Sequence, residues 1–86
     1  MKKIWDDEAW GEYVAWQAED KKTLGRINEL LKDIDRNGHK GIGKPEPLKH
    51  IKGYWSREID KKNRLVYKIE NGEIKIIQCG THYRDK

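Results

Sequence analysis

The stretch RLVYKIENGEIKIIQCG, residues 64–80, determines the expected fold. Apolar and polar side chains alternate over residues 64–70 and again over residues 73–80, and a period of two is typical of β-strands. Asn71-Gly72 stands between the two runs, and this pair tolerates the positive backbone angles of a tight hairpin turn. The sequence therefore predicts two neighbouring antiparallel strands.

Two helical patterns lie upstream of this hairpin. The first, residues 8–20, places these side chains on one helical side, with Trp16 beside them: Trp10, Tyr13, Val14 and Gln17. In the second, which Asp20 can cap, apolar residues recur at helical spacing: Leu24, Ile27, Leu30, Leu31 and Ile34. Asn37-Gly38 suits the end of this helix, because both residues tolerate left-handed backbone.

Three further segments complete the predicted order. Residues 1–5 and 54–59 have strand character, whereas the glycines and prolines of residues 38–48 predict an ordered loop. The order β-α-α-β-β-β indicates an α+β fold with two helices packed on one face of a small, mostly antiparallel twisted sheet. We expect one domain, 1–86, whose other sheet face is open.

The positive charge is concentrated in the middle of the chain. The net charge is +4, and residues 39–69 carry nine Lys and Arg against three acidic residues, whereas residues 1–38 carry seven against nine. A basic block of this kind indicates a surface that faces a polyanion, and the alternative is a solvated lysine-rich face. Arg57 and Arg64 are expected to line the open sheet face, where guanidinium groups can bind phosphate.

Three kinds of side chain together suit the cleavage of RNA without a metal. Glu46 stands between Pro45 and Pro47, whose rings stiffen the backbone that presents the carboxylate. A carboxylate can take the proton of the 2′-hydroxyl, Arg64 can stabilise the charge on the phosphate, and His82 has a reference pKa near neutrality and can protonate the leaving oxygen. Aromatic residues among the basic ones, Tyr54 and Trp55, can stack on bases but are more often core.

Other classes of site and location find little support. Cys79 and His82 have a C-x-x-H spacing, but no second pair of ligands accompanies them, so we expect neither a metal nor a cofactor. The single cysteine excludes an internal disulfide and fits the cytoplasm. No apolar run reaches the length of a signal peptide or a membrane span, so we expect no membrane partner.

Four motifs resemble the YoeB/Txe toxins of the RelE/ParE superfamily: KPEPLKH (44–50), GYWSREI (53–59), NRLVY (63–67) and the HY pair (82–83). Residues 4–36 are similar to the two-helix half of that family. The resemblance implies the toxin of a bacterial type II toxin–antitoxin pair, an endoribonuclease that cuts mRNA in the A site of the 70S ribosome and stops translation. It also implies an antitoxin of the YefM/Axe type as partner, and a homodimer is possible.

Roles for single residues follow from the same resemblance. Glu46 is similar to the general base, His82 to the general acid, Arg64 to the phosphate-stabilising arginine and Tyr83 to the aromatic that orients the nucleotide. Further basic positions of the site, expected to bind RNA, are Lys49, His50, Lys52 and Arg57. Two features depart from the family pattern: Glu58 replaces a second arginine, and the chain continues past Tyr83. Alternation predicts that Glu58 points away from the face that carries Arg57.

Two other functions remain compatible with this fold. ParE-type relatives lack the catalytic set and act on DNA gyrase, and a plain RNA-binding module would keep the basic block without cleaving. The joint presence of Glu46, Arg64 and His82 favours the enzyme over both alternatives.

Overall fold

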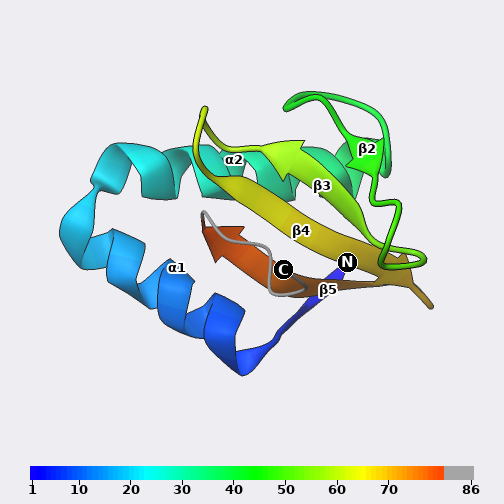
Figure 1. Ribbon diagram of the computed structural model, residues 1–86, viewed down its shortest axis with the longest axis horizontal. Helices are drawn as coiled ribbons and strands as arrows, with labels where there is room; N and C mark the ends of the chain where they lie inside the picture. Colours follow the sequence, from blue (N-terminus) through cyan, green and yellow to red (C-terminus); the bar gives the residue numbers. More distant parts are fainter. Residues whose placement is uncertain (81–86) are drawn as a thin grey trace.

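The computed structural model describes residues 1–80, which form two helices and a five-stranded sheet (Figure 1). The elements are β1 (Lys2–Trp5), α1 (Asp7–Glu19), α2 (Lys21–Asn37), β2 (Glu46–Pro47), β3 (Trp55–Glu58), β4 (Arg64–Glu70) and β5 (Glu73–Gly80). The expected α+β class is confirmed. The expected order lacked β2, a strand of two residues inside the segment that was predicted to be a loop.

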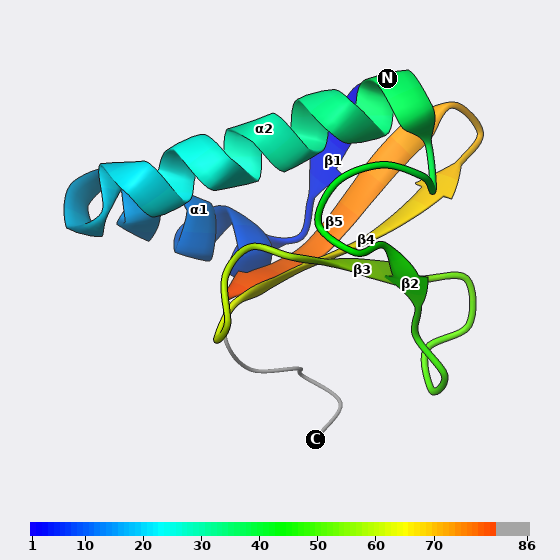
Figure 2. The ribbon, with the colours of Figure 1, turned by 90° about the horizontal axis from the view of Figure 1, so that it is seen from above.

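The strands lie in the order β1-β5-β4-β3-β2. β1 pairs with β5 in parallel, and the other neighbours are antiparallel. Periodicity alone could not place β1, which lies at one edge of the sheet while β2 lies at the other. Both helices cover the same face of this sheet, and the opposite face carries no helix among residues 1–80 (Figure 2).

The β4–β5 hairpin and α2 form as their sequences predict. Asn71 and Gly72 have φ angles of 53° and 74°, the positive values that this tight turn requires. Asp20 begins α2 by accepting hydrogen bonds from the backbone N–H groups of Lys22 and Thr23, and Gly38 ends it with a φ of 63°. The apolar stripe of α2 is buried against the sheet. The core consists of Ala9, Ile27, Leu30, Leu31, Ile34, Ile59, Leu65, Tyr67, Ile74, Ile76 and Cys79.

The inward face of α1 differs from the side that its aromatic residues suggest. Trp10 and Val14 are 50% and 44% exposed, whereas Ala9 is fully buried and Tyr13 and Trp16 pack against the core. Apolar side chains occur all around this helix, so its periodicity does not single out one face. Trp10 instead stacks on the outer side of a small aromatic group with Trp5 and Tyr13.

Two side chains of α1 complete the edge of β5 where β1 has ended. β1 pairs with β5 as far as Ile76, and Cys79 lies three residues beyond that point. The Glu12 carboxylate accepts a hydrogen bond of 2.9 Å from the Cys79 N–H, and the Trp16 indole N–H donates one of 2.8 Å to the Cys79 carbonyl. These bonds satisfy backbone polar groups of a buried residue.

We expect Glu12→Ala to lower the free energy of unfolding by about 1–3 kcal/mol, because the variant loses the hydrogen bond between the Glu12 carboxylate and the N–H of the buried Cys79. Glu19→Ala, an exposed position on the same helix, is the control and should change the value by less than about 0.5 kcal/mol. Urea unfolding of both variants measures the difference. Equal stabilities would contradict this role of Glu12.

Candidate active site

Glu46 lies on the edge strand of the open sheet face. β2 pairs with β3 so that Glu46 lies opposite Ser56, and the Glu46 side chain is 63% exposed. Pro45 and Pro47 have no N–H to donate, which suits an edge strand and blocks further strand pairing there. The two prolines thus stiffen the backbone around the carboxylate and protect the edge that carries it.

Arg64, the first residue of β4, joins this carboxylate to a hydroxyl of β3. Its Nη2 donates to the Glu46 Oε1 at 3.2 Å and to the Ser56 Oγ at 2.9 Å. Among residues 1–80, the buried Nε of Arg64 has no hydrogen-bond partner. A guanidinium with a spare donor beside a carboxylate can bind an oxyanion and keep a base next to it. The sequence reasoning missed Ser56, although its place two residues after Tyr54 was a signal that both share one face.

Apart from Arg57, the remaining predicted residues form two groups. Lys49, His50 and Lys52 are exposed on the loop between β2 and β3, next to the strand pair that carries Glu46. His82 and Tyr83 lie outside the described residues. The structure therefore brings together Glu46, Ser56 and Arg64, with three basic side chains on the adjoining loop.

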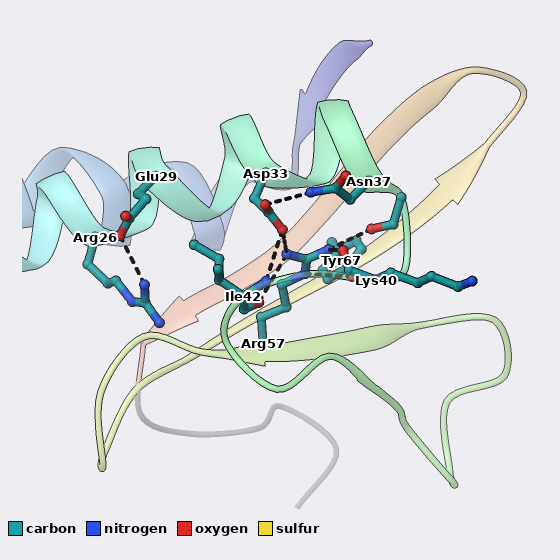
Figure 3. Close-up of polar contacts among 9 residues, drawn as sticks. Arg26, Glu29, Asp33, Asn37, Lys40, Ile42, Arg57 and Tyr67 are labelled. Atoms are coloured by element: carbon teal, nitrogen blue, oxygen red, sulfur yellow. Dashed lines mark hydrogen bonds and ion pairs between the residues drawn. The ribbon is translucent and has the colours of Figure 1, made fainter.

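Arg57 does not line the open face, contrary to the expectation. Its side chain is fully buried on the helix side of the sheet, beneath the loop that joins α2 to β2 (Figure 3). It donates to the Asp33 carboxylate, to the Tyr67 hydroxyl and to three carbonyls of that loop, those of Gly38, Lys40 and Ile42. All donor groups of Arg57 are engaged within the protein. In this arrangement Arg57 therefore has no donor left for the phosphate contact that the sequence suggested.

This network changes the protonation behaviour of its members. The hydrogen bond from Arg57 is the main cause that lowers the pKa of Asp33, and burial opposes it. Burial raises the pKa of Tyr67, against a smaller opposite effect of Arg57. Both shifts keep Asp33 charged and Tyr67 neutral at ordinary pH, the forms that the network needs. Arg57 therefore fastens the loop that precedes Glu46 to the core.

Glu58 lies on the sheet face that carries the site, although alternation was expected to turn it away from that face. It does point away from Arg57, but because Arg57 faces the helices, Glu58 lies on the face that carries Arg64. Glu58 is opposite Arg64 in the β3–β4 pairing and forms an ion pair of 3.5 Å with Lys44. A negative group therefore borders the site.

His39 stacks within the loop that Arg57 holds. Its ring lies 4.1 Å from the Trp55 ring, nearly parallel to it, and its buried Nδ1 has no partner among residues 1–80. Burial, and then the charge of Arg57, lower the pKa of His39. The neutral imidazole is thus the form that fits this position.

We expect the stability of the protein to fall as the pH decreases from 7.5 to 5.5. The unfolded chain protonates His39 near pH 6.5 while the folded state resists, so the loss amounts to up to about 1.4 kcal/mol at pH 5.5. Asp33, whose pKa is lowered, remains charged throughout this window. His39→Phe keeps the stacked ring without the proton, and urea unfolding at both pH values should show a smaller loss. An unchanged pH dependence would contradict the role of His39.

Comparisons with known proteins place the chain in a family. The family described as YoeB-like toxin of bacterial type II toxin-antitoxin system matches residues 5–83. The chain is 48% identical to Toxin YoeB of Escherichia coli K12 over 84 residues, 96% of this chain and all of that protein. It is also 48% identical to Toxin YoeB of Synechocystis over 85 residues, 98% of this chain and 99% of the relative.

Solved structures agree with this result. A YoeB/ParE toxin from Agrobacterium tumefaciens superposes with a TM-score of 0.93 at 40% identity, covering 96% of this chain and 100% of that one. YoeB in a complex with YefM from Staphylococcus aureus gives a TM-score of 0.91 at 47% identity, covering 96% and 98%. The fold and the family match thus define the chain as a toxin of a bacterial type II toxin–antitoxin system. Within that class, the chain belongs to the YoeB-like toxin family.

No helix among residues 1–80 is both long enough and apolar enough to cross a membrane.

Proposed function

We propose that this protein is a ribosome-dependent endoribonuclease that cuts mRNA in the A site and so inhibits translation. The observation that carries the proposal is the cluster on the open sheet face, in which Arg64 bonds the Glu46 carboxylate and the Ser56 hydroxyl and keeps a buried Nε donor unpaired among residues 1–80. The Arg64 side chain is 23% exposed, so the outer part of its guanidinium can donate to a phosphate oxygen. The Glu46 carboxylate, as general base, and the phosphate would then both be bound by the Arg64 guanidinium.

The reaction needs only the substrate and these side chains. Glu46 takes the proton of the 2′-hydroxyl, and the 2′-oxygen attacks the phosphorus. The bond from phosphorus to the 5′-oxygen breaks, leaving a 2′,3′-cyclic phosphate, while Arg64 stabilises the charge that develops on the phosphate oxygens. His82 donates a proton to the departing 5′-oxygen, and Tyr83 orients the nucleotide.

The roles of His82 and Tyr83 rest on the family resemblance. Gly80, the last residue of β5, pairs with Arg64 across the sheet. His82 and Tyr83 lie outside the described residues, and their roles as acid and as orienting aromatic are proposed from the resemblance.

We propose that the basic loop between β2 and β3 binds the RNA backbone and positions it at the site. Lys49, His50 and Lys52 are exposed there and can follow the phosphate backbone on either side of the cleaved bond. Such contacts hold RNA without reading its sequence. Arg57 has no part in this binding because its donors are engaged in the core.

Mapping of mRNA 5′ ends on translating ribosomes tests the proposal. We expect new ends within A-site codons when the protein is added, and none when the message carries 2′-deoxy nucleotides at those codons. Intact message with the wild-type protein would contradict cleavage and favour a toxin of the gyrase-inhibitor type or a plain RNA-binding module.

We further propose that the chain acts in the cytoplasm and is inhibited by an antitoxin of the YefM/Axe type. A similar Staphylococcus aureus toxin was solved as a heterotetrameric YoeB–YefM complex and as a YoeB dimer. The exposed apolar side chains of Ile4, Trp10 and Val14 give this chain a surface on which apolar burial can hold a partner. Co-expression with an antitoxin of the YefM/Axe type should yield a complex that survives high salt.

A further inference from the structure

Tyr54, directly before β3, and Trp55, the first residue of β3, lie on opposite faces of the sheet. Trp55 stacks on His39 and packs against the core on the helix side. Tyr54 lies on the other side, where the Nζ of Lys68 is 5.6 Å from the centre of its ring. Of the two aromatics that could contact a base, only Tyr54 shares the face that carries Glu46 and Arg64.

Tyr54 lies next to the cluster that binds the phosphate. Glu46 pairs with Ser56, and the same ladder continues with a hydrogen bond of 2.9 Å from the Leu48 N–H to the Tyr54 carbonyl. Ser56, whose hydroxyl accepts from Arg64, follows Tyr54 by two residues, which is about 6.6 Å along a strand. This separation suits the step from one nucleotide to its neighbour in an extended single strand.

A hollow of about 390 Å³ adjoins the Tyr54 ring on this face. Its lining comes from β1, the start of α1, β5 and Tyr54: Ile4, Trp5, Asp6, Asp7, Tyr54, Lys75, Ile76 and Ile77. Volumes of a few hundred Å³ are typical of sites that hold small ligands, so the hollow has room for one base. The tyrosine and the isoleucines supply apolar contacts, and Asp6, Asp7 and Lys75 supply polar ones.

The charges around Tyr54 favour an uncharged group over a phosphate. Lys68 and Lys75 both pair with Glu70, at 3.3 and 2.8 Å. Hydrogen bonds from Lys75 and Lys68 lower the pKa of Glu70, so this carboxylate stays ionised and offsets one of the two positive charges. The carboxylates of Asp6 and Asp7 at the far wall also disfavour a phosphate.

We propose that Tyr54 is the stacking platform for the base of a nucleotide next to the cleaved bond in single-stranded RNA. This inference rests on the proposed ribonuclease function and adds a binding subsite to it. Stacking of a base on an aromatic ring tolerates every base, because each has a π face. Tyr54 therefore fixes the position of the chain at the site without selecting a codon.

Steady-state cleavage on programmed ribosomes tests the platform. Tyr54→Leu removes the π face but keeps an apolar side chain, and Tyr54→Phe keeps the ring. We expect KM to rise about tenfold or more in Tyr54→Leu with kcat nearly unchanged, and to stay within about twofold of the wild type in Tyr54→Phe. Matching thermal unfolding of all three proteins confirms that the fold is retained.

A binding readout separates stacking from catalysis. A message with 2-aminopurine beside the scissile position, and a 2′-deoxy nucleotide at that position, binds without being cut. We expect wild type and Tyr54→Phe to quench its fluorescence more than Tyr54→Leu does. Equal KM and equal quenching in Tyr54→Leu and wild type would contradict the stacking role of Tyr54. Cleavage by the wild type in the same experiment would still support the proposed ribonuclease function. No cleavage of all-ribose message by the wild type would overturn the proposed function and the subsite with it.

Discussion

Glu46→Gln is expected to lower the rate of mRNA cleavage by about 10²–10⁴-fold, because the amide cannot take the proton of the 2′-hydroxyl. The fold should persist, since the Glu46 side chain is 63% exposed on a two-residue edge strand. The amide keeps the size of the carboxylate, so the contact with Arg64 changes in charge more than in shape. Single-turnover cleavage on programmed ribosomes measures the rate, and relief of growth arrest reports it in cells.

Glu58→Gln is the matched control for this variant. Glu58 is a second carboxylate on the same sheet face, opposite Arg64 in the strand pairing, and it bonds the exposed Lys44. An ion pair of this kind contributes at most about 1 kcal/mol, so we expect a change of less than about fivefold. Similar losses in the two variants would mean that the site responds to total charge, and the role of Glu46 as base would be wrong.

Arg57→Met is expected to lower the free energy of unfolding by about 3–5 kcal/mol, a large part of the stability of a small domain. Methionine fills much of the space but donates no hydrogen bond. The Asp33 carboxylate then loses the cation that holds it, and the carbonyls of Gly38, Lys40 and Ile42 lose their donor. The loop that leads to Glu46 should detach from the core.

Arg26→Met provides the control on the same molecule. Arg26 forms a partly exposed pair with Glu29 within α2, which Figure 3 shows beside the buried network. We expect its loss to change the stability by less than about 0.5 kcal/mol. Arg57→Lys should fall between the two, because one ammonium group cannot reach all the acceptors of the planar guanidinium. Urea unfolding with equal midpoints for Arg57→Met and Arg26→Met would contradict the proposed importance of the network.

Local signals were sufficient for both helices and for every described strand except β2. The Asn71-Gly72 turn and the apolar stripe of α2 depend on residues that are close in sequence. Each of these local sequences favours a single backbone conformation. Glu46 and Arg64 were also identified from the sequence, and the structure brings them together at 3.2 Å. Their convergence depends on the β2–β3 pairing, which the prolines concealed because they suggested a loop.

The errors concern which face a side chain occupies. Side-chain alternation correctly placed Arg57 and Ser56 on opposite faces of the sheet. It does not say which of the two faces packs against the helices. Charge suggested that Arg57 was exposed, and its burial is possible only because Asp33, 24 residues earlier, and the intervening loop supply acceptors. The orientation of α1 was missed for a similar reason, since Glu12 faces inward to bond a strand that comes 67 residues later. Contacts so distant in sequence leave no local pattern.

The order of the strands also sets when a newly made chain can complete its sheet. Among the elements of residues 1–80, β5 follows all the others in the chain, yet it lies between β1 and β4 and supplies Ile74 and Ile76 to the core. Until β5 has been made, β1 has no strand to pair with among residues 1–80 and Arg64 lacks its neighbour Gly80. Both edges of the sheet, and the surroundings of Arg64, are therefore completed only after β5 has been added.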